Sequence, residues 1–209
     1  AGLGIPPEVF EPSGEILYLK AGIVAADLVT TVSPRYAREI QTEEFGGALC
    51  DFYRANKAKL SGIANGIDQA TWNPATDPHL PARYSADDLD GKAMCKAELR
   101  REVGLAASAT DAPDPPLFGV VSRLAEHKGI DWVCEAAEAL VGAGGQLVVL
   151  GAGDPAIEAR LRELAARHPE KIAVRIGFDE KAAHRIGAAS DFFLMPSRFE
   201  PCGLSQLYS

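Results

Sequence analysis

Two basic residues stand in a short segment that follows an apolar run. Arg123 and Lys128 lie within residues 122–129, directly after the apolar run 117–121. A guanidinium group offers paired hydrogen bonds and an ammonium group offers a compact charge, a combination that suits a diphosphate. Taken alone, the segment is explained equally well by two surface bases on a loop.

A second segment, residues 196–205 (PSRFEPCGLS), combines a carboxylate with the expected start of a helix. The first amides of a helix have no partner within it and favour phosphate, so we expect Gly203, Leu204 and Ser205 to offer N–H groups to one. Glu200 lies beside this positive end, where a carboxylate can accept hydrogen bonds from sugar hydroxyls. The alternative for Glu200 is a plain capping carboxylate. No base adjoins Cys202, so we expect its thiol to pack or to touch substrate, not to act as a nucleophile.

Two further segments carry weaker signals. Residues 151–156 (GAGDPA) match G-x-G-x-x-A, but no acidic residue ends a strand near position 173, so a dinucleotide fingerprint is not supported. We expect a tight strand-to-helix turn over a ligand, which places Gly153 and Asp154 at the site. Phe178 either stacks on a nucleotide base or belongs to the core.

Regular alternation of strands and helices predicts how these segments are positioned. Continuous apolar runs, typical of strands buried on both faces, alternate with stretches of helical periodicity from residue 116 onward. This pattern predicts an α/β fold with a doubly wound parallel sheet. Ligands bind such sheets at the carboxyl ends of the strands. The expected strands are 117–121, 147–150, 172–176 and 192–195, and the segments that follow them are 122–129, 151–154, 177–179 and 196–205.

The upstream part is less regular. We expect a helix over 16–26, a short strand over 28–32 and a helix capped by Ser33 with Pro34 at its first position. A strand and turn over 60–67 and a long irregular connection over 68–91 follow, and a helix covers 92–103.

Composition excludes several classes of protein. The net charge of −8 opposes binding to a polyanion, so nucleic acid is not an expected partner. No apolar run approaches the roughly 20 residues of a membrane span. The four cysteines are widely spaced, which argues against a zinc site or a disulfide framework and favours a reducing compartment. The chain lacks an initiating Met and stops within an expected helix, so we expect both ends to continue.

The motifs resemble those of the bacterial glycogen synthase and plant starch synthase family, which are retaining glucosyltransferases with the two-domain GT-B fold. The resemblance covers nearly the whole chain in the family's order. Its strongest element is PSRFEPCGL at 196–204; the others are VSRL at 121–124 with KG at 128–129, LGAGD at 150–154, YLKAG at 18–22, TVSP at 31–34, NGID at 65–68 and WNP at 72–74.

The resemblance implies roles for individual residues. Arg123 and Lys128 would hold the diphosphate of the donor, and Glu200 would contact the transferred glucose with Cys202 and Gly203 close by. Leu204 and Ser205 would donate backbone N–H groups to phosphate. Phe178 falls where bacterial enzymes often place Tyr against adenine, and Asn65 would lie near the glucose and the acceptor. Related GT-B enzymes carry a second Glu where this chain has Tyr208, as this family also tends to have.

The implied activity is transfer of glucose from ADP-glucose to the non-reducing end of an α-1,4-glucan, glycogen or starch, with no cofactor and no metal. Residues 1–64 would be the tail of the amino-terminal GT-B domain, and residues 65–209 the first part of the carboxy-terminal domain. The family's Lys-x-Gly-Gly-Leu motif and its acceptor-side His have no counterpart here. The compartment would be the cytoplasm of a bacterium or the plastid of a plant or alga. Two alternatives stay open: a related GT-B enzyme that uses a UDP- or GDP-sugar, and a nucleotide- or glucan-binding fragment without catalysis.

Overall fold

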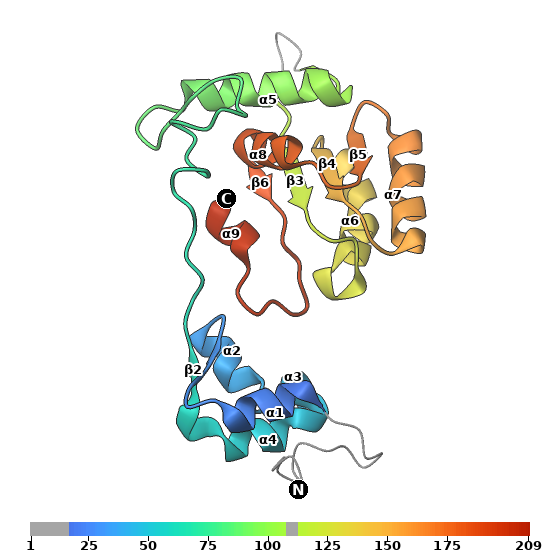
Figure 1. The fold of residues 1–209 in the computed structure, drawn as a ribbon. Helices are drawn as coiled ribbons and strands as arrows, with labels where there is room; N and C mark the ends of the chain where they lie inside the picture. The colour runs from blue at the N-terminus through green and yellow to red at the C-terminus, as the bar shows by residue number, and fades with distance from the viewer. Residues whose placement is uncertain (1–16, 108–112) are drawn as a thin grey trace, which may run out of the picture. The chain divides into compact units, whose positions relative to one another are not determined.

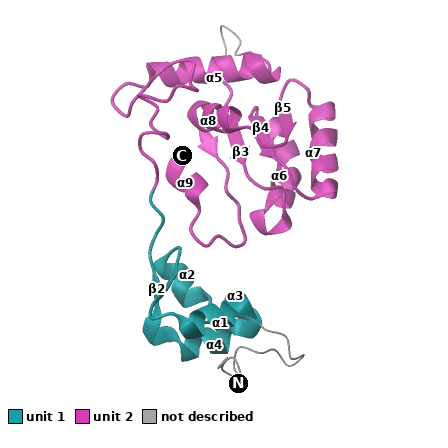
Figure 2. Cartoon of the chain, in the orientation of Figure 1, with its two compact units in different colours: residues 1–66 teal, residues 67–209 magenta. Residues whose placement is uncertain are grey.

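The computed structural model describes residues 17–107 and 113–209. The chain separates into two compact units, residues 1–66 and residues 67–209 (Figure 2). The expected boundary between residues 64 and 65 lies next to this division. The assignment of the units to the two domains of a GT-B enzyme stays a prediction.

The first unit is built mainly of short helices around one pair of parallel strands (Figure 1). Its second helix begins as expected, because the Ser33 hydroxyl accepts a hydrogen bond from Tyr36 N at 3.0 Å and Pro34 follows the cap. The elements are α1 Tyr18–Ala25, β1 Val29–Thr31, α2 Pro34–Glu39, α3 Glu43–Gly46, η2 Gly47–Leu49, α4 Cys50–Ala55, η3 Lys57–Lys59 and β2 Leu60–Gly62.

The second unit contains a four-stranded sheet in the order β5-β4-β3-β6, in which every paired strand is parallel. The expected doubly wound α/β fold is confirmed. The elements are α5 Asp90–Val103, β3 Leu117–Val121, η4 Glu126–Lys128, α6 Ile130–Gly142, β4 Gln146–Gly151, α7 Pro155–Arg167, β5 Ile172–Ile176, α8 Glu180–Ala189, β6 Phe192–Phe193 and α9 Leu204–Tyr208.

Strand β6 is shorter than the sequence predicts. The expected strand covers 192–195, whereas regular pairing with β3 covers only Phe192 and Phe193. Leu194 N still donates to Gly119 O at 2.8 Å. Pro196 follows two residues later and has no N–H to donate, so the ladder ends before it.

The sheet has an apolar core on each face, because side chains alternate between the faces along a strand. In β4, Leu147 and Val149 face the core formed with α6 and α7, while Val148 and Leu150 face the core formed with α5 and α8. All four of these side chains are at most 2% exposed. A continuous apolar run is therefore the pattern that this strand requires.

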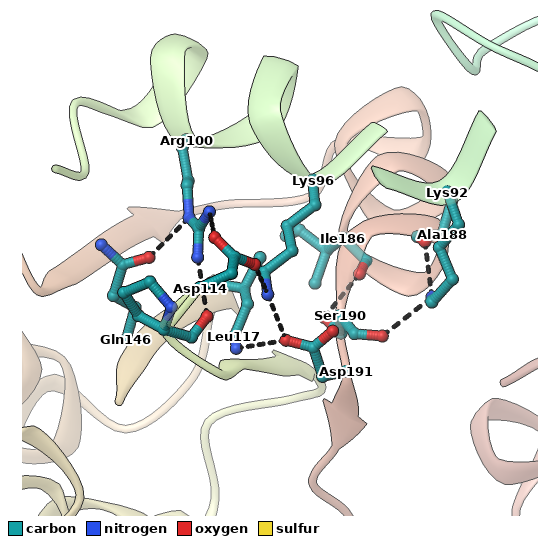
Figure 3. A network of polar contacts seen from close by, with 11 residues as sticks. Lys92, Lys96, Arg100, Asp114, Leu117, Gln146, Ile186, Ala188, Ser190 and Asp191 are labelled. Carbon is teal, nitrogen blue, oxygen red and sulfur yellow. Dashed lines mark hydrogen bonds and ion pairs between the residues drawn. The ribbon is translucent and has the colours of Figure 1, made fainter. Parts of the chain in front are cut away.

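A polar network fixes α5 at the amino end of the sheet (Figure 3). Arg100 donates to Gln146 Oε1 at 2.7 Å and to Asp114 Oδ1 at 2.5 Å. Lys96 pairs with Asp114 and, at 2.6 Å, with Asp191, whose carboxylate also accepts from Leu117 N. Arg100 and Lys96 are both buried, so their charges are compensated inside the protein.

The order of the strands reverses between β3 and β6, where a ligand-binding crevice is expected. The chain runs from β3 through α6 to β4, and through α7 to β5, before α8 carries it back to the opposite side of β3. The chain therefore continues in opposite directions along the sheet after β3 and after β6. Such a reversal of strand order is where open α/β sheets bind ligands.

Candidate functional site

The two loops at this crevice are joined by an ion pair. Lys128 Nζ lies 2.6 Å from Glu200 Oε2, and the Ser197 hydroxyl donates to the same oxygen at 3.1 Å. The side chains of Lys128 and Glu200 are 16% and 23% exposed. The structure thus brings together one residue from each segment that the sequence singled out, although they are 72 positions apart.

The backbones of the two loops are also in close contact. Gly129 has a φ of 68°, and a Cβ placed on it would lie 2.1 Å from Pro196 O. Arg198 N donates to His127 O at 2.9 Å. Glycine at position 129 therefore allows both the left-handed turn and the approach of the second loop.

Arg198 clamps the second loop to the beginning of α6. Its guanidinium donates to both oxygens of Asp131, at 2.7 and 2.5 Å, and to Glu126 O, and it lies 4.0 Å from the centroid of the Trp132 ring. The hydrogen bonds from Arg198 lower the pKa of Asp131 to about 2. The pKa of Arg198 is raised in turn by Asp131.

No local sequence pattern predicts the ion pair between Arg198 and Asp131. Asp131 lies three positions after Lys128, and Arg198 lies two before Glu200. The available signal was an acidic residue just after the segment 122–129 and a basic residue within the segment 196–205. Lys128–Glu200 and Asp131–Arg198 together form two bridges between the loops.

Arg123 is exposed on the first loop, and its Nη2 lies 3.4 Å from His127 Nε2. Its convergence with Lys128 on one ligand stays a prediction. Both residues belong to the loop after β3, but the Arg123 side chain is exposed to solvent, whereas the Lys128 side chain is mostly buried.

The turn after β4 packs tightly against the loop after β3. Gly153 forms a bridge with Leu124, and a Cβ on Gly153 would lie 2.3 Å from Leu124 O. Asp154 caps α7, accepting from Ala156 N at 2.7 Å and Ile157 N at 3.4 Å. The Gly153 amide donates to Glu158 Oε1 at 3.0 Å. Ligand contacts of Gly153 and Asp154 stay predictions, and both residues have local structural roles.

Helix α9 begins where the sequence places it. Gly203 adopts a φ of 82° and precedes the five-residue helix Leu204–Tyr208. A Cβ on Gly203 would lie 3.1 Å from Glu200 Cγ, so the turn packs directly on the Glu200 side chain. Cys202 is a free, partly buried thiol. Phosphate binding by Gly203, Leu204 and Ser205 stays a prediction.

The remaining predicted residues lie on other loops. Phe178 follows β5 and is 92% exposed, so its interpretation as a core residue is wrong. Asn65 is exposed near the end of the first unit. Contacts of Phe178 and Asn65 with a nucleotide or a sugar stay predictions.

Within residues 17–107 and 113–209, no group of three or more His, Cys, Asp or Glu residues could hold a metal ion. In the same ranges, no helix is both long enough and apolar enough to cross a membrane.

The segments that form this site match known protein families. The family model described as the starch synthase catalytic domain matches residues 1–55, and the model described as glycosyl transferases group 1 matches residues 115–208. A glycogen synthase from Paracidovorax citrulli is 58% identical over 94% of this chain and 38% of its own length. A glycogen synthase from Anaeromyxobacter dehalogenans strain 2CP-1 is 53% identical over 99% of this chain and 44% of its own length.

The fold matches a solved structure of the same kind. The catalytic domain of starch synthase IV from Arabidopsis thaliana, bound to ADP and acarbose, aligns with a TM-score of 0.87 and 38% identity. The alignment covers 94% of this chain and 40% of that one. The chain thus spans about two fifths of the length of the relatives described here.

Proposed function

Because the chain belongs to the glycogen synthase and starch synthase family, whose members have the GT-B fold, we propose that it is part of an enzyme that transfers glucose from ADP-glucose to an α-1,4-glucan. The observation that carries this proposal is the Lys128–Glu200 ion pair across the crevice between β3 and β6. The relatives named glycogen synthase and the starch synthase IV structure bound to ADP and acarbose support the choice of donor and acceptor.

The chemical difficulty is the negative charge that develops on the departing ADP. Lys128 is held at the crevice by Glu200 and is mostly buried, where a positive charge acts more strongly than in water. Arg123 on the same loop and the amides that begin α9 would supply further donors to the diphosphate. These groups would stabilise the leaving group without a metal ion.

Glu200 is placed to orient the transferred glucose. One of its oxygens is shared by Lys128 and Ser197, which fixes the carboxylate plane. The other oxygen would accept hydrogen bonds from sugar hydroxyls. We propose that Glu200 positions the sugar and stabilises positive charge on its ring without bonding covalently to it, and that the transfer retains the anomeric configuration.

The chain on its own would bind nucleotide without turnover. A GT-B active site closes between two domains, and this chain covers 38% of one glycogen synthase and 44% of another. Calorimetry with ADP on the 209-residue chain, beside a glucosyl-transfer assay on the same sample, separates binding from catalysis. Turnover by the isolated chain would contradict this part of the proposal.

The full-length protein provides the main test. With glycogen as acceptor, release of ADP from ADP-glucose should exceed release of UDP or GDP from the corresponding glucose donors. Lys128→Ala and Arg123→Ala should each lower kcat/KM by about 10²–10³-fold, as does removal of one preorganised donor to a developing negative charge.

A matched control is Lys171→Ala, which removes a lysine at the amino end of β5, at the opposite edge of the sheet from the site. Its activity should stay within about twofold of the unaltered protein. Preference for UDP- or GDP-glucose would identify the chain as part of a related GT-B enzyme with another donor. Near-normal activity of Lys128→Ala would contradict the proposed stabilisation of the departing ADP by Lys128.

A further inference from the structure

A stack of three rings links α9 to α8 through the irregular segment that begins the second unit. The Trp72 ring lies between His184 and Tyr208, with centroid distances of 3.7 and 4.2 Å and interplanar angles of 11° and 6°. His184 belongs to α8, Tyr208 belongs to α9, and Trp72 lies six positions after the last residue of the first unit. Nearly parallel rings on both faces of an indole fix its position and its tilt.

The His184 end of the stack is anchored in the interior. Its side chain is 0% exposed, and its Nδ1 lies 2.6 Å from Asp77 Oδ2. Asp77 is itself fixed, because its other oxygen accepts from His79 N at 2.8 Å and its own amide donates to Asn73 O at 2.8 Å. Trp72 therefore rests on a ring that is held in place by the protein core.

The Tyr208 end reaches the crevice. Tyr208 is the last residue of α9, and Gly203 directly precedes the helix. Gly203 packs on Glu200, which pairs with Lys128. The long side chain of Gln206 returns to Cys202 O at 3.3 Å, within the same turn, so it does not tie α9 to the sheet. The Tyr208 ring instead ties α9, through Trp72, to His184 of α8.

We infer that Trp72 and Tyr208 are positioning residues for donor binding: their stack on His184 holds α9, and with it the turn 200–205, at the distance from Lys128 that a nucleotide diphosphate requires. This inference rests on the proposed function and adds two residues to which no donor contact is assigned. It also gives Tyr208 a role of its own, because the residue acts through the face of its ring and does not contact the donor through its hydroxyl.

The test uses ring removal and hydroxyl removal separately in the full-length protein. Tyr208→Ala and Trp72→Ala each remove the Trp72–Tyr208 pair, and each should raise the KM for ADP-glucose and the Kd for ADP by about three- to tenfold, the range that the loss of this pair produces. Tyr208→Phe keeps the stacked ring and should leave both constants within about twofold. The KM for glycogen should stay unchanged in all three variants, because the acceptor does not depend on α9.

A double variant shows whether the two rings act together. If Trp72 and Tyr208 act through one contact, Trp72→Ala with Tyr208→Ala should raise the KM for ADP-glucose little more than either change alone. Phe192→Ala is the matched control, since Phe192 stacks on Phe118 at a centroid distance of 5.0 Å outside this cluster. That variant should lower the thermal midpoint without changing the KM for the donor.

Three results would overturn the inference. A rise in donor KM for Tyr208→Phe equal to that for Tyr208→Ala would show a direct contact through the hydroxyl. Multiplicative effects of the two alanine changes would show that the rings act separately. Unchanged donor KM in both alanine variants would show that α9 needs no such support. Failure of the proposed function is distinguished from all three, because the unaltered protein would then release no ADP from ADP-glucose.

Discussion

Arg198 and Asp131 form a two-point ion pair between the loop after β6 and the first turn of α6, with N–O distances of 2.7 and 2.5 Å. The pair joins positions 67 residues apart. Asp131 lies close to Lys128 in the sequence, and Arg198 lies close to Glu200. The pair therefore fixes the position of Glu200 relative to Lys128 without needing to touch a ligand.

The paired hydrogen bonds of the Arg198 guanidinium should affect activity more than its positive charge does. Arg198→Lys keeps the positive charge but loses the second hydrogen bond and the flat contact with Trp132. In the full-length protein we expect kcat/KM for ADP-glucose to fall by about 10- to 100-fold, because small displacements at a site carry costs of this size. Arg167→Lys, at a half-exposed pair between the end of α7 and Glu138 in the later part of α6, is the control and should have almost no effect. Equal activities of the two variants would argue against the clamp.

The Arg198–Asp131 pair should make the stability of the folded protein depend on pH in the acidic range. The pKa of Asp131 is about 2 in the folded protein and 3.8 ordinarily, so the pair stabilises fully above about pH 4. This contribution disappears as pH falls from about 4 to about 2, because the unfolded chain takes up the proton first. Thermal midpoints of the unaltered protein and Asp131→Asn should differ by a constant amount above pH 5 and converge near pH 2. A difference that persists unchanged at pH 2.5 would contradict the assignment.

Gly129 should tolerate no side chain. Gly129→Ala adds a methyl group 2.1 Å from Pro196 O at a φ of 68°, so it combines a clash with backbone strain. We expect a loss of about 2–4 kcal/mol in the free energy of unfolding, measured with denaturant, together with reduced activity. Gly187→Ala in α8 is the control, since nothing lies within 4 Å of the added atom. It should stabilise by about 0.5–1 kcal/mol through helix propensity, and a similar loss in both variants would refute the contact.

The network around α5 offers a comparison of neighbouring arginines. Arg100→Ala removes the buried donor to Gln146 Oε1 and Pro115 O and leaves Asp114 with Lys96 alone, so it should cost about 3 kcal/mol or more (Figure 3). Arg101→Ala removes an exposed pair with Glu98 and should change the free energy of unfolding by less than about 0.5 kcal/mol. Urea denaturation distinguishes them. Equal costs would show that the buried network does not stabilise α5.

The sheet was predictable because its signals are local. Runs such as residues 147–150 are apolar at every position because cores cover both faces of β4. The start of α2 followed from a cap with a definite chemistry at Ser33, whereas the cap formed by Asp154 was not predicted. The end of β6 was missed because pairing with β3 is a long-range event and Pro196 stops it earlier than the apolar run suggests.

The candidate site was predictable only in part. The fold pattern placed Lys128 and Glu200 in loops at the carboxyl ends of strands, but neither the adjacency of β3 and β6 nor the ion pair is contained in a local pattern. Arg198 and Asp131 were missed because each looks like an ordinary surface charge until the other is beside it. The stacking of Trp72, His184 and Tyr208 was missed for the same reason, since contact between three distant segments leaves no periodic trace.

The return of the chain from β5 to β6 has a consequence for the order of folding. Strands β3, β4 and β5 pair with their neighbours in sequence, whereas Phe192 pairs with Phe118 across the whole segment that contains β4 and β5. Closing so long a loop is slow, because its entropy is lost before the contact forms. We therefore expect the three-strand core to gain protection from amide hydrogen exchange first during refolding, and the crevice to take shape last.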